Sequence, residues 1–120
     1  MNMNKKSIEA NPELLKQLEE LFEDQEENIN KAVRCLKVLA HPQRLKILCV
    51  LQTGEHSVQQ LEKYVGIAQA TLSQHLSLLK DRGILTSRRQ GNFSLYSVAN
   101  HDMIDLFTMI QKIFCTQAEH

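Results

Sequence analysis

The chain has 120 residues, of which 23% are charged and 5% aromatic, and its 14 Lys and Arg balance 14 Asp and Glu. This length fits one domain with a modest core that would gain from dimerisation. No apolar run approaches the roughly 18 residues that cross a bilayer, and the polar start MNMNKKSIEANPE lacks the apolar segment of a signal peptide, so we expect a cytoplasmic protein without membrane contact.

The zero net charge hides an asymmetry along the chain. Residues 1–28 hold eight acidic and three basic residues, whereas residues 29–120 hold six acidic and eleven basic ones. An acidic arm therefore precedes a basic body, and a basic body favours nucleic acid as a partner.

Apolar residues at helical spacing predict a long helical region from Pro12 to Ala40, with a bend or break in EDQEEN, residues 23–28. Such a region has more apolar surface than a small domain covers, so we expect it to pair with a second copy of the chain. The alternative is a helix folded back on its own core.

The stretch PQRLKILCVL, residues 42–51, predicts the next helix, which begins at Pro42 because proline fits the first helical turn. Its expected inward residues are Leu45, Leu48 and Cys49, with Ile47 and Leu51 beside them. The stretch QTGEH, residues 52–56, is expected to form a loop.

Residues 57–83 predict two helices joined by a tight turn. Ser57 suits the N-cap of the first helix, and Gly66 suits the position at its end where φ becomes positive. An apolar stripe then resumes at Leu72. Two helices joined by a short turn that contains glycine are typical of a helix-turn-helix.

The outward face of the second helix carries short uncharged side chains in place of the Glu, Lys and Arg that favour a solvated helix. They are Gln69, Thr71, Ser73, Gln74, His75 and Ser77. No acidic residue occurs between Gly66 and Lys80, and amides and hydroxyls are groups that read base edges. We therefore predict that these residues bind double-stranded DNA, with His75 packed beside the duplex or touching it. The alternative is a merely polar surface helix.

Two strands, residues 84–89 and 93–98, are expected next, joined by the turn Gln90-Gly91-Asn92 into a β-wing. Arg88 and Arg89 lead into its tip, where guanidinium groups can meet phosphates or a minor groove. The alternative for this pair is solvated surface charge.

A last helix is predicted from Asp102 to Thr116. It is apolar around too much of its circumference for one domain, so it is a second candidate for a dimer interface. No glycine-rich phosphate loop, paired carboxylates or nucleophile–base arrangement is readable, so we expect neither an enzyme nor a cofactor.

The stretches LAHPQRLKIL at 39–48 and ATLSQHLSLLKDRGIL at 70–85, with the wing after them, resemble the ArsR/SmtB family of winged-helix repressors. The resemblance covers residues 29–116 and implies a mainly helical winged helix-turn-helix domain with a small β-hairpin. It leaves an acidic N-terminal arm or helix at 1–28 and a tail at 117–120. It also implies a homodimer through the N- and C-terminal helices, which releases its DNA operator when a ligand binds at a remote site.

Two metal sites of that family are missing from this sequence. Ser57 and Gln59 stand where metal sensors carry a Cys-x-Cys, and neither is a soft ligand. The Asp-x-His site of the last helix meets Ile104 and Phe107 where its histidine would stand. We therefore expect no metal site.

Cys49 and Cys115 match the two sensing cysteines of the persulfide-responsive SqrR/BigR/HlyU-type subgroup. The resemblance implies that the two thiols face each other within one subunit. Reactive sulfur species, persulfides or polysulfides, would join them through a tetrasulfide bridge and thereby release the operator. Without the resemblance both would be interpreted as small buried hydrophobic residues, as Cys35 is.

Other inputs and roles stay open at this point. The same regulator could sense peroxide through a disulfide, or act as an anti-repressor that competes with a nucleoid protein. Further alternatives are a metal or arsenic sensor that uses all three cysteines, and an interaction adaptor that has lost DNA binding.

Overall fold

The computed structural model describes residues 9–115, and the chain divides into two compact units, the first ending at Leu36 and the second beginning at Lys37. Within the described residues no helix has the length and apolar character to cross a membrane. The predicted tail at 117–120, and the predicted end of the last helix at Thr116, lie outside the described residues.

The first unit is helical. Helix α1 (Pro12–Asp24) begins where Asn11 Oδ1 accepts hydrogen bonds from the backbone N–H groups of Glu13 (3.0 Å) and Leu14 (3.1 Å). Helix α2 (Glu26–Leu39) follows after Gln25 and runs into the second unit, so the break predicted in residues 23–28 is confirmed. No residue of α1 is buried. The exposed large apolar side chains of this unit are Leu14, Leu15, Phe22, Val33 and Leu36.

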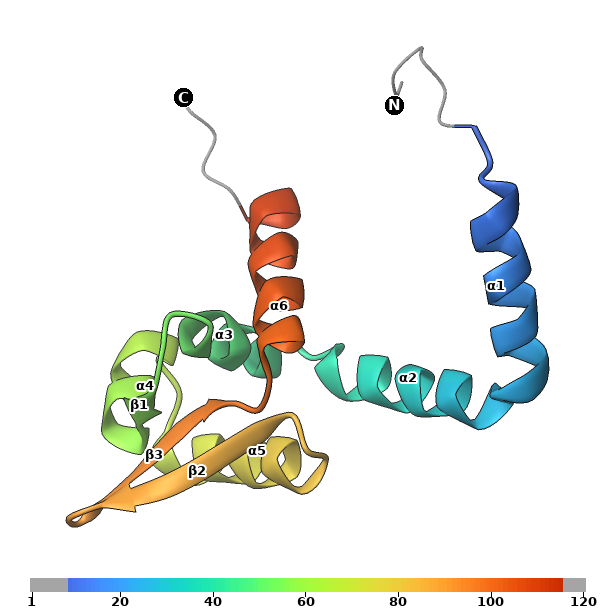
Figure 1. The fold of residues 1–120 in the computed structure, drawn as a ribbon. Coiled ribbons are helices and arrows are strands. Elements are labelled where there is room, and N and C mark those ends of the chain that lie inside the picture. Colours follow the sequence, from blue (N-terminus) through green and yellow to red (C-terminus); the bar gives the residue numbers. More distant parts are fainter. Residues whose placement is uncertain (1–8, 116–120) are drawn as a thin grey trace, which may run out of the picture. The chain divides into compact units, whose positions relative to one another are not determined.

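The second unit holds the remaining elements, and Figure 1 shows the hairpin β2–β3 lying alongside α5. They are α3 (Pro42–Leu51), β1 (His56–Ser57), α4 (Val58–Val65), α5 (Gln69–Asp81), β2 (Leu85–Gln90), β3 (Phe93–Val98) and α6 (His101–Phe114). A mainly helical fold with a small antiparallel sheet is therefore confirmed. The boundary proposed at residues 28 and 29 stays a prediction.

The sheet has three strands in the order β1-β3-β2, all antiparallel. The predicted wing is β2–β3, and Gly91 with φ 64° makes its turn. The loop prediction for residues 52–56 is wrong at its end, because His56 pairs with Tyr96 in β1. A strand of two residues is too short for an alternating pattern, and its partner is distant in the sequence.

The core lies where α3, α4, α5, the sheet and α6 meet. Its fully buried large side chains are Phe107, Ile47, Leu48, Leu51, Leu61, Leu72, Leu76, Leu79 and Ile84. The orientation predicted for α3 is therefore partly wrong: Ile47 and Leu51 are buried, whereas Leu45 and Cys49 are only half-buried. The reason is that α3 packs against α4, α6 and β3, so a single inward face does not describe it.

Helix α6 begins at His101, one residue before the predicted start, because Asn100 Oδ1 accepts from the N–H of Met103 at 2.9 Å. Phe107 anchors α6 in the core. Gln52, at the C-terminus of α3, also hydrogen bonds to α6: its Oε1 accepts from Thr108 Oγ1 and its Nε2 donates to Gln111 Oε1. The large apolar side chains that α6 leaves exposed are Leu106, Met109, Ile113 and Phe114.

Candidate nucleic-acid interface and thiol pocket

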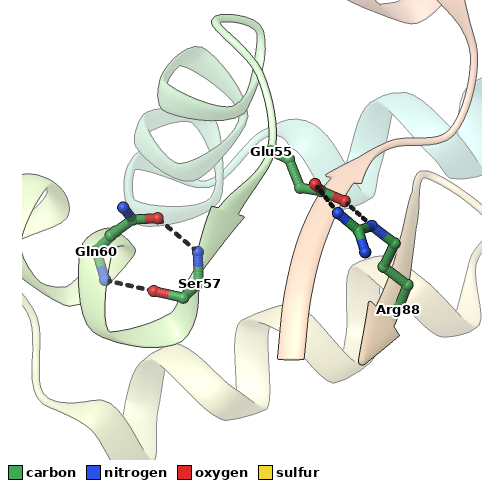
Figure 2. A network of polar contacts seen from close by, with 4 residues as sticks. All are labelled: Glu55, Ser57, Gln60 and Arg88. Carbon is green, nitrogen blue, oxygen red and sulfur yellow. Dashed lines mark hydrogen bonds and ion pairs between the residues drawn. The ribbon is translucent and has the colours of Figure 1, made fainter. Parts of the chain in front are cut away.

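The helix-turn-helix is fixed by contacts at both ends of α4. Ser57 Oγ accepts from the N–H of Gln60 at 3.1 Å, and Gln60 Oε1 accepts from the N–H of Ser57 at 2.9 Å (Figure 2). This capping box satisfies two backbone donors that the first turn would leave unpaired. At the other end Gly66 adopts φ 79°, which stops α4 and lets the chain turn into α5.

Helix α5 buries its apolar stripe and exposes its polar one. Leu72, Leu76 and Leu79 are fully buried. The predicted DNA-binding residues on the other side are all exposed: Gln69, Thr71, Ser73, Gln74 and Ser77. Within residues 9–115 none of these five side chains hydrogen bonds to another part of the protein. Their donors and acceptors are therefore available to an external partner.

His75 differs from its neighbours on α5, because it is half-buried and packs edge-on against the ring of His41, with 4.7 Å between the ring centroids. His41 is itself held, since its Nδ1 accepts from the N–H of Gln43 at 3.1 Å and caps α3. Burial, followed by the nearby His41 and Arg44, lowers the pKa of His75. His75 thus joins α5 to the start of α3.

The two predicted wing arginines lie in different surroundings on β2. Arg88 forms a bidentate ion pair with Glu55, the residue before β1 (Figure 2). The hydrogen bonds from Arg88 lower the pKa of Glu55, and Glu55 in turn raises the pKa of Arg88. Arg89 Nη2 instead donates to the carbonyl of Gly91 at 3.4 Å. Sequence reasoning missed Glu55, because no local pattern links it to a strand 33 residues further on.

Cys49 and Cys115 line the same pocket, which has a volume of about 480 Å³. Cys49 comes from α3, and Cys115 follows the last turn of α6. The remaining lining residues are Pro42, Leu45, Lys46, Val50, Tyr64 and Gln111. A second hollow of about 430 Å³ shares Cys49, Val50, Tyr64 and Gln111 with it. The structure therefore brings together the two thiols that the sequence singled out.

The two thiols differ in exposure and in their electrostatic surroundings. Cys49 is half-buried and Cys115 is exposed. Burial raises the pKa of Cys49, and the neighbouring Cys115 raises it further. Cys35 is half-buried in the first unit and does not line the pocket. Across residues 9–115 no three His, Cys, Asp or Glu side chains gather as a metal site would require.

Comparison with known proteins agrees with this arrangement of elements. Residues 41–87 match the bacterial regulatory proteins of the arsR family. The biofilm growth-associated repressor of Xylella fastidiosa (strain Temecula1) is 41% identical over 95 residues, which cover 79% of this chain and 83% of that protein. The transcriptional activator HlyU of Vibrio cholerae is 31% identical over 94 residues, covering 78% of this chain and 87% of that protein.

Solved structures are similar over the same region. Reduced HlyU from Vibrio cholerae superposes with a TM-score of 0.72 at 31% identity, covering 78% of this chain and 98% of that one. The repressor BigR from Xylella fastidiosa gives 0.70 at 40% identity, covering 79% and 97%. A homodimeric winged helix-turn-helix domain from Mycobacterium bovis gives 0.66 at 28% identity, covering 81% and 95%.

These relatives are transcriptional regulators, so the prediction of a DNA-binding regulator and not an enzyme is confirmed. The residues quoted for the family resemblance, at 39–48 and 70–85, overlap the matched region. The chain belongs to the ArsR family of bacterial regulatory proteins and carries its winged helix-turn-helix.

Proposed function

We propose that this ArsR-family regulator is a homodimeric repressor that loses its operator when reactive sulfur species bridge Cys49 and Cys115. The observation that carries the proposal is that both thiols line one pocket, between α3, α4 and the C-terminal end of α6. The operator, the second copy of the chain and the sulfur species are the three partners that the proposal requires.

Exposed polar groups on α5 support its role in reading DNA. Amide and hydroxyl side chains suit the base edges of a major groove, and Gln69, Ser73 and Gln74 present such groups to solvent. Ala68, at the N-cap of α5, makes no side-chain cap, so the backbone N–H groups of the first turn are open to a phosphate. The arginines of β2 add cationic groups beside this helix.

Uncovered apolar surface supports the homodimer. The exposed large side chains of α6 include Ile113, at 62% of its maximal exposure, and Phe114, at 78%. Apolar side chains of this size favour burial against another molecule. A two-fold dimer would place two copies of α5 to read the two halves of a symmetric operator.

The chemistry of the bridge follows from the exposure of the two thiols. Thiolates are the nucleophiles in sulfur exchange, so the exposed Cys115 attacks a sulfane sulfur first, becomes a persulfide and releases the donor's thiol. Two further sulfane sulfur atoms from the donor extend this persulfide. The thiolate of Cys49 then attacks the second added sulfur, and this attack closes the bridge and expels the outermost sulfur. In a tetrasulfide two cysteines take up two sulfane sulfur atoms. A third sulfane sulfur accepts the two electrons and two protons of the thiols and leaves as hydrogen sulfide.

Bridging would change the part of the molecule that the dimer is proposed to use. A covalent link from Cys115 to Cys49 ties the end of α6 to α3 and constrains the exposed apolar face next to it. Moving this face changes how far apart two copies of α5 lie in a dimer. Allosteric coupling of about 1–3 kcal/mol is enough to weaken operator binding up to roughly 150-fold.

Mass spectrometry combined with operator binding tests this function. The reduced protein is treated separately with inorganic polysulfide, with hydrogen peroxide and with arsenite or zinc. Each treated sample is then tested for binding to promoter DNA of the gene that encodes the protein. We expect a Cys49–Cys115 link with added sulfur, and loss of binding, only after polysulfide. A plain disulfide formed by peroxide, with the same loss of binding, would instead identify a peroxide sensor, and binding of one equivalent of zinc or arsenite would identify a metal or arsenic sensor.

The variants Cys49→Ser and Cys115→Ser separate sensing from folding. Each should bind the operator as the unchanged protein does and should fail to respond to polysulfide. Cys35→Ser is the matched control and should keep the response. Loss of operator binding in Cys49→Ser before any treatment would mean that this thiol is only a packing residue.

A further inference from the structure

The wing carries a fixed ion pair. Glu55 Oε2 accepts from Arg88 Nε at 2.8 Å, and Glu55 Oε1 accepts from Arg88 Nη2 at 2.9 Å. Both carboxylate oxygens and two adjacent nitrogens take part, which is the bidentate geometry of strong arginine–carboxylate pairs. Glu55 precedes β1 and Arg88 lies on β2, so the two side chains meet across β3, the central strand of the sheet (Figure 2).

The backbone holds Glu55 in place from both sides. Before it, the N–H of Gly54 donates to the carbonyl of Leu51 at 3.1 Å. After it, His56 and Ser57 pair with β3, and Ser57 also belongs to the capping box of α4. The backbone that carries the Glu55 carboxylate is therefore continuous with β1 and α4, which position the helix-turn-helix. The carboxylate of an ordinary surface ion pair lacks this support.

This contact leaves a defined part of the arginine for another acceptor. A guanidinium has five N–H donors in a planar fork, and Glu55 occupies donors on the Nε and Nη2 side alone. The side chain of Arg88 keeps 57% of its exposure, and among residues 9–115 no group accepts a hydrogen bond from its Nη1. Arg89, next to it, has no ion-pair partner within residues 9–115.

We propose that Glu55 determines the specificity of the wing by holding Arg88 side-on, so that Arg88 contributes at a correctly seated operator and little on unrelated DNA. The inference rests on the DNA-binding role proposed above. The acceptor for the Nη1 edge is an oxygen of the duplex, either a phosphate or a base edge in the minor groove.

The physical reason is that a paired and oriented cation discriminates where a mobile one does not. A free arginine follows the phosphates of any duplex, and each phosphate that it neutralises releases counterions regardless of sequence. The Arg88–Glu55 pair as a whole has no net charge, and its carboxylate repels a phosphate that approaches off-register. When α5 is seated on its sequence, the oriented Nη1 edge reaches its acceptor without losing further side-chain freedom.

The test compares the operator with an unrelated duplex of equal length, using Glu55→Gln. The variant should bind the unrelated duplex about three- to fivefold more tightly, a factor that corresponds to the upper range of the energy of an exposed ion pair. Its affinity for the operator should rise less than about twofold. For the unrelated duplex, the slope of the logarithm of the binding constant against the logarithm of the salt concentration should become steeper by about 0.9, because the variant neutralises one more phosphate. The preference for the operator therefore falls.

Glu27→Gln is the matched control, because it makes the same charge change and breaks the exposed pair of Glu27 with Arg34 (2.9 Å) in the first unit. It should leave the preference for the operator unchanged. In an Arg88→Ala background, Glu55→Gln removes only the repulsion by the carboxylate, so it should no longer change the preference for the operator. An unchanged preference in Glu55→Gln, or weaker binding of both duplexes, overturns the inference.

Arg88→Ala alone distinguishes this failure from failure of the wing's proposed role. If Arg88→Ala weakens operator binding while Glu55→Gln keeps the preference, only the inference about Glu55 fails. If Arg88→Ala changes the binding of neither duplex, Arg88 does not contact DNA, and both the wing assignment and the inference are wrong.

Discussion

Cys49 and Cys115 line one pocket although 66 positions of the sequence separate them, Cys49 within α3 and Cys115 directly after α6. They are close enough for Cys115 to contribute to the raised pKa of Cys49. The hydrogen bonds of Gln52 to Thr108 and Gln111 hold α3 and α6 together beside this pocket. The two thiols are therefore neighbours because two helices pack, and their chemistry depends on that packing.

The pH dependence of alkylation tests this neighbourhood directly. In a Cys35→Ser background, the rate at which iodoacetamide modifies Cys49 should rise only above the pH range of an ordinary thiol, because the pKa of Cys49 is raised. Adding Cys115→Ser should move this rise to lower pH without restoring an ordinary profile, since burial is the larger cause. Peptide mapping of initial rates measures both profiles, with the unfolded protein as reference. Identical profiles with and without Cys115 would contradict the proximity of the two thiols.

The exposed face of α5 should carry sequence recognition. Replacing Gln74 or Ser73 with Ala should lower operator affinity by about 1–3 kcal/mol and relax the preference for the base pair that it contacts. Gln17→Ala, an exposed amide on α1, is the control and should change neither. Competition binding against single-base variants of the operator measures both effects. Equal affinity losses for all duplexes would show that Ser73 and Gln74 contact the phosphates only.

Arg89 should act without regard to sequence. Its side chain is exposed and has no acidic partner among the described residues, so Arg89→Ala should weaken binding to the operator and to unrelated DNA by similar factors. The slope of log K against log salt should become shallower by about 0.9. Titrations at a series of sodium chloride concentrations measure this slope, and an unchanged slope would mean that Arg89 is solvated surface charge.

The outer face of α6 should hold the dimer together. Ile113→Asp places a charge on a side chain that is 62% exposed in the single chain, so it should leave the fold intact and raise the dimer dissociation constant by at least tenfold. Asp105→Ser, an exposed polar position on the same helix, is the control. Sedimentation equilibrium measures the dissociation constants. A dimer unaffected by Ile113→Asp would place the interface elsewhere.

His75 should make stability depend on pH. Burial, His41 and Arg44 lower its pKa in the folded protein below the ordinary value of 6.5, so the unfolded chain takes up this proton first as the pH falls. Between the two pKa values the unfolded state binds more protons, and the free energy of unfolding therefore decreases as the pH drops below about 6.5. Urea unfolding at pH 7.5 and 5.5 should show a smaller decrease in His75→Gln than in the unchanged protein. An equal decrease in both would exclude His75 as a cause.

Local signals in the sequence determined the helix-turn-helix and its boundaries. Ser57 and Gln60 lie within hydrogen-bonding reach along the chain, and Gly66 ends α4 by its own conformational freedom. The leucine stripe of α5 then decides which face is buried and leaves the polar face exposed. The sequence also carries the family membership in its stretches at 39–48 and 70–85.

Tertiary structure alone decided the features that join distant segments. Strand β1 exists because His56 meets Tyr96, the burial of Ile47 depends on the elements packed around α3, and Glu55 reaches Arg88 across a third strand. The pocket shared by the two thiols depends on the same kind of packing, and the sequence indicated it only through the family resemblance. Each of these contacts requires the chain to close a long loop before any interaction is gained, so no short window of sequence contains a signal for it. Capping and helical periodicity act over a few residues and can therefore be predicted directly from the sequence.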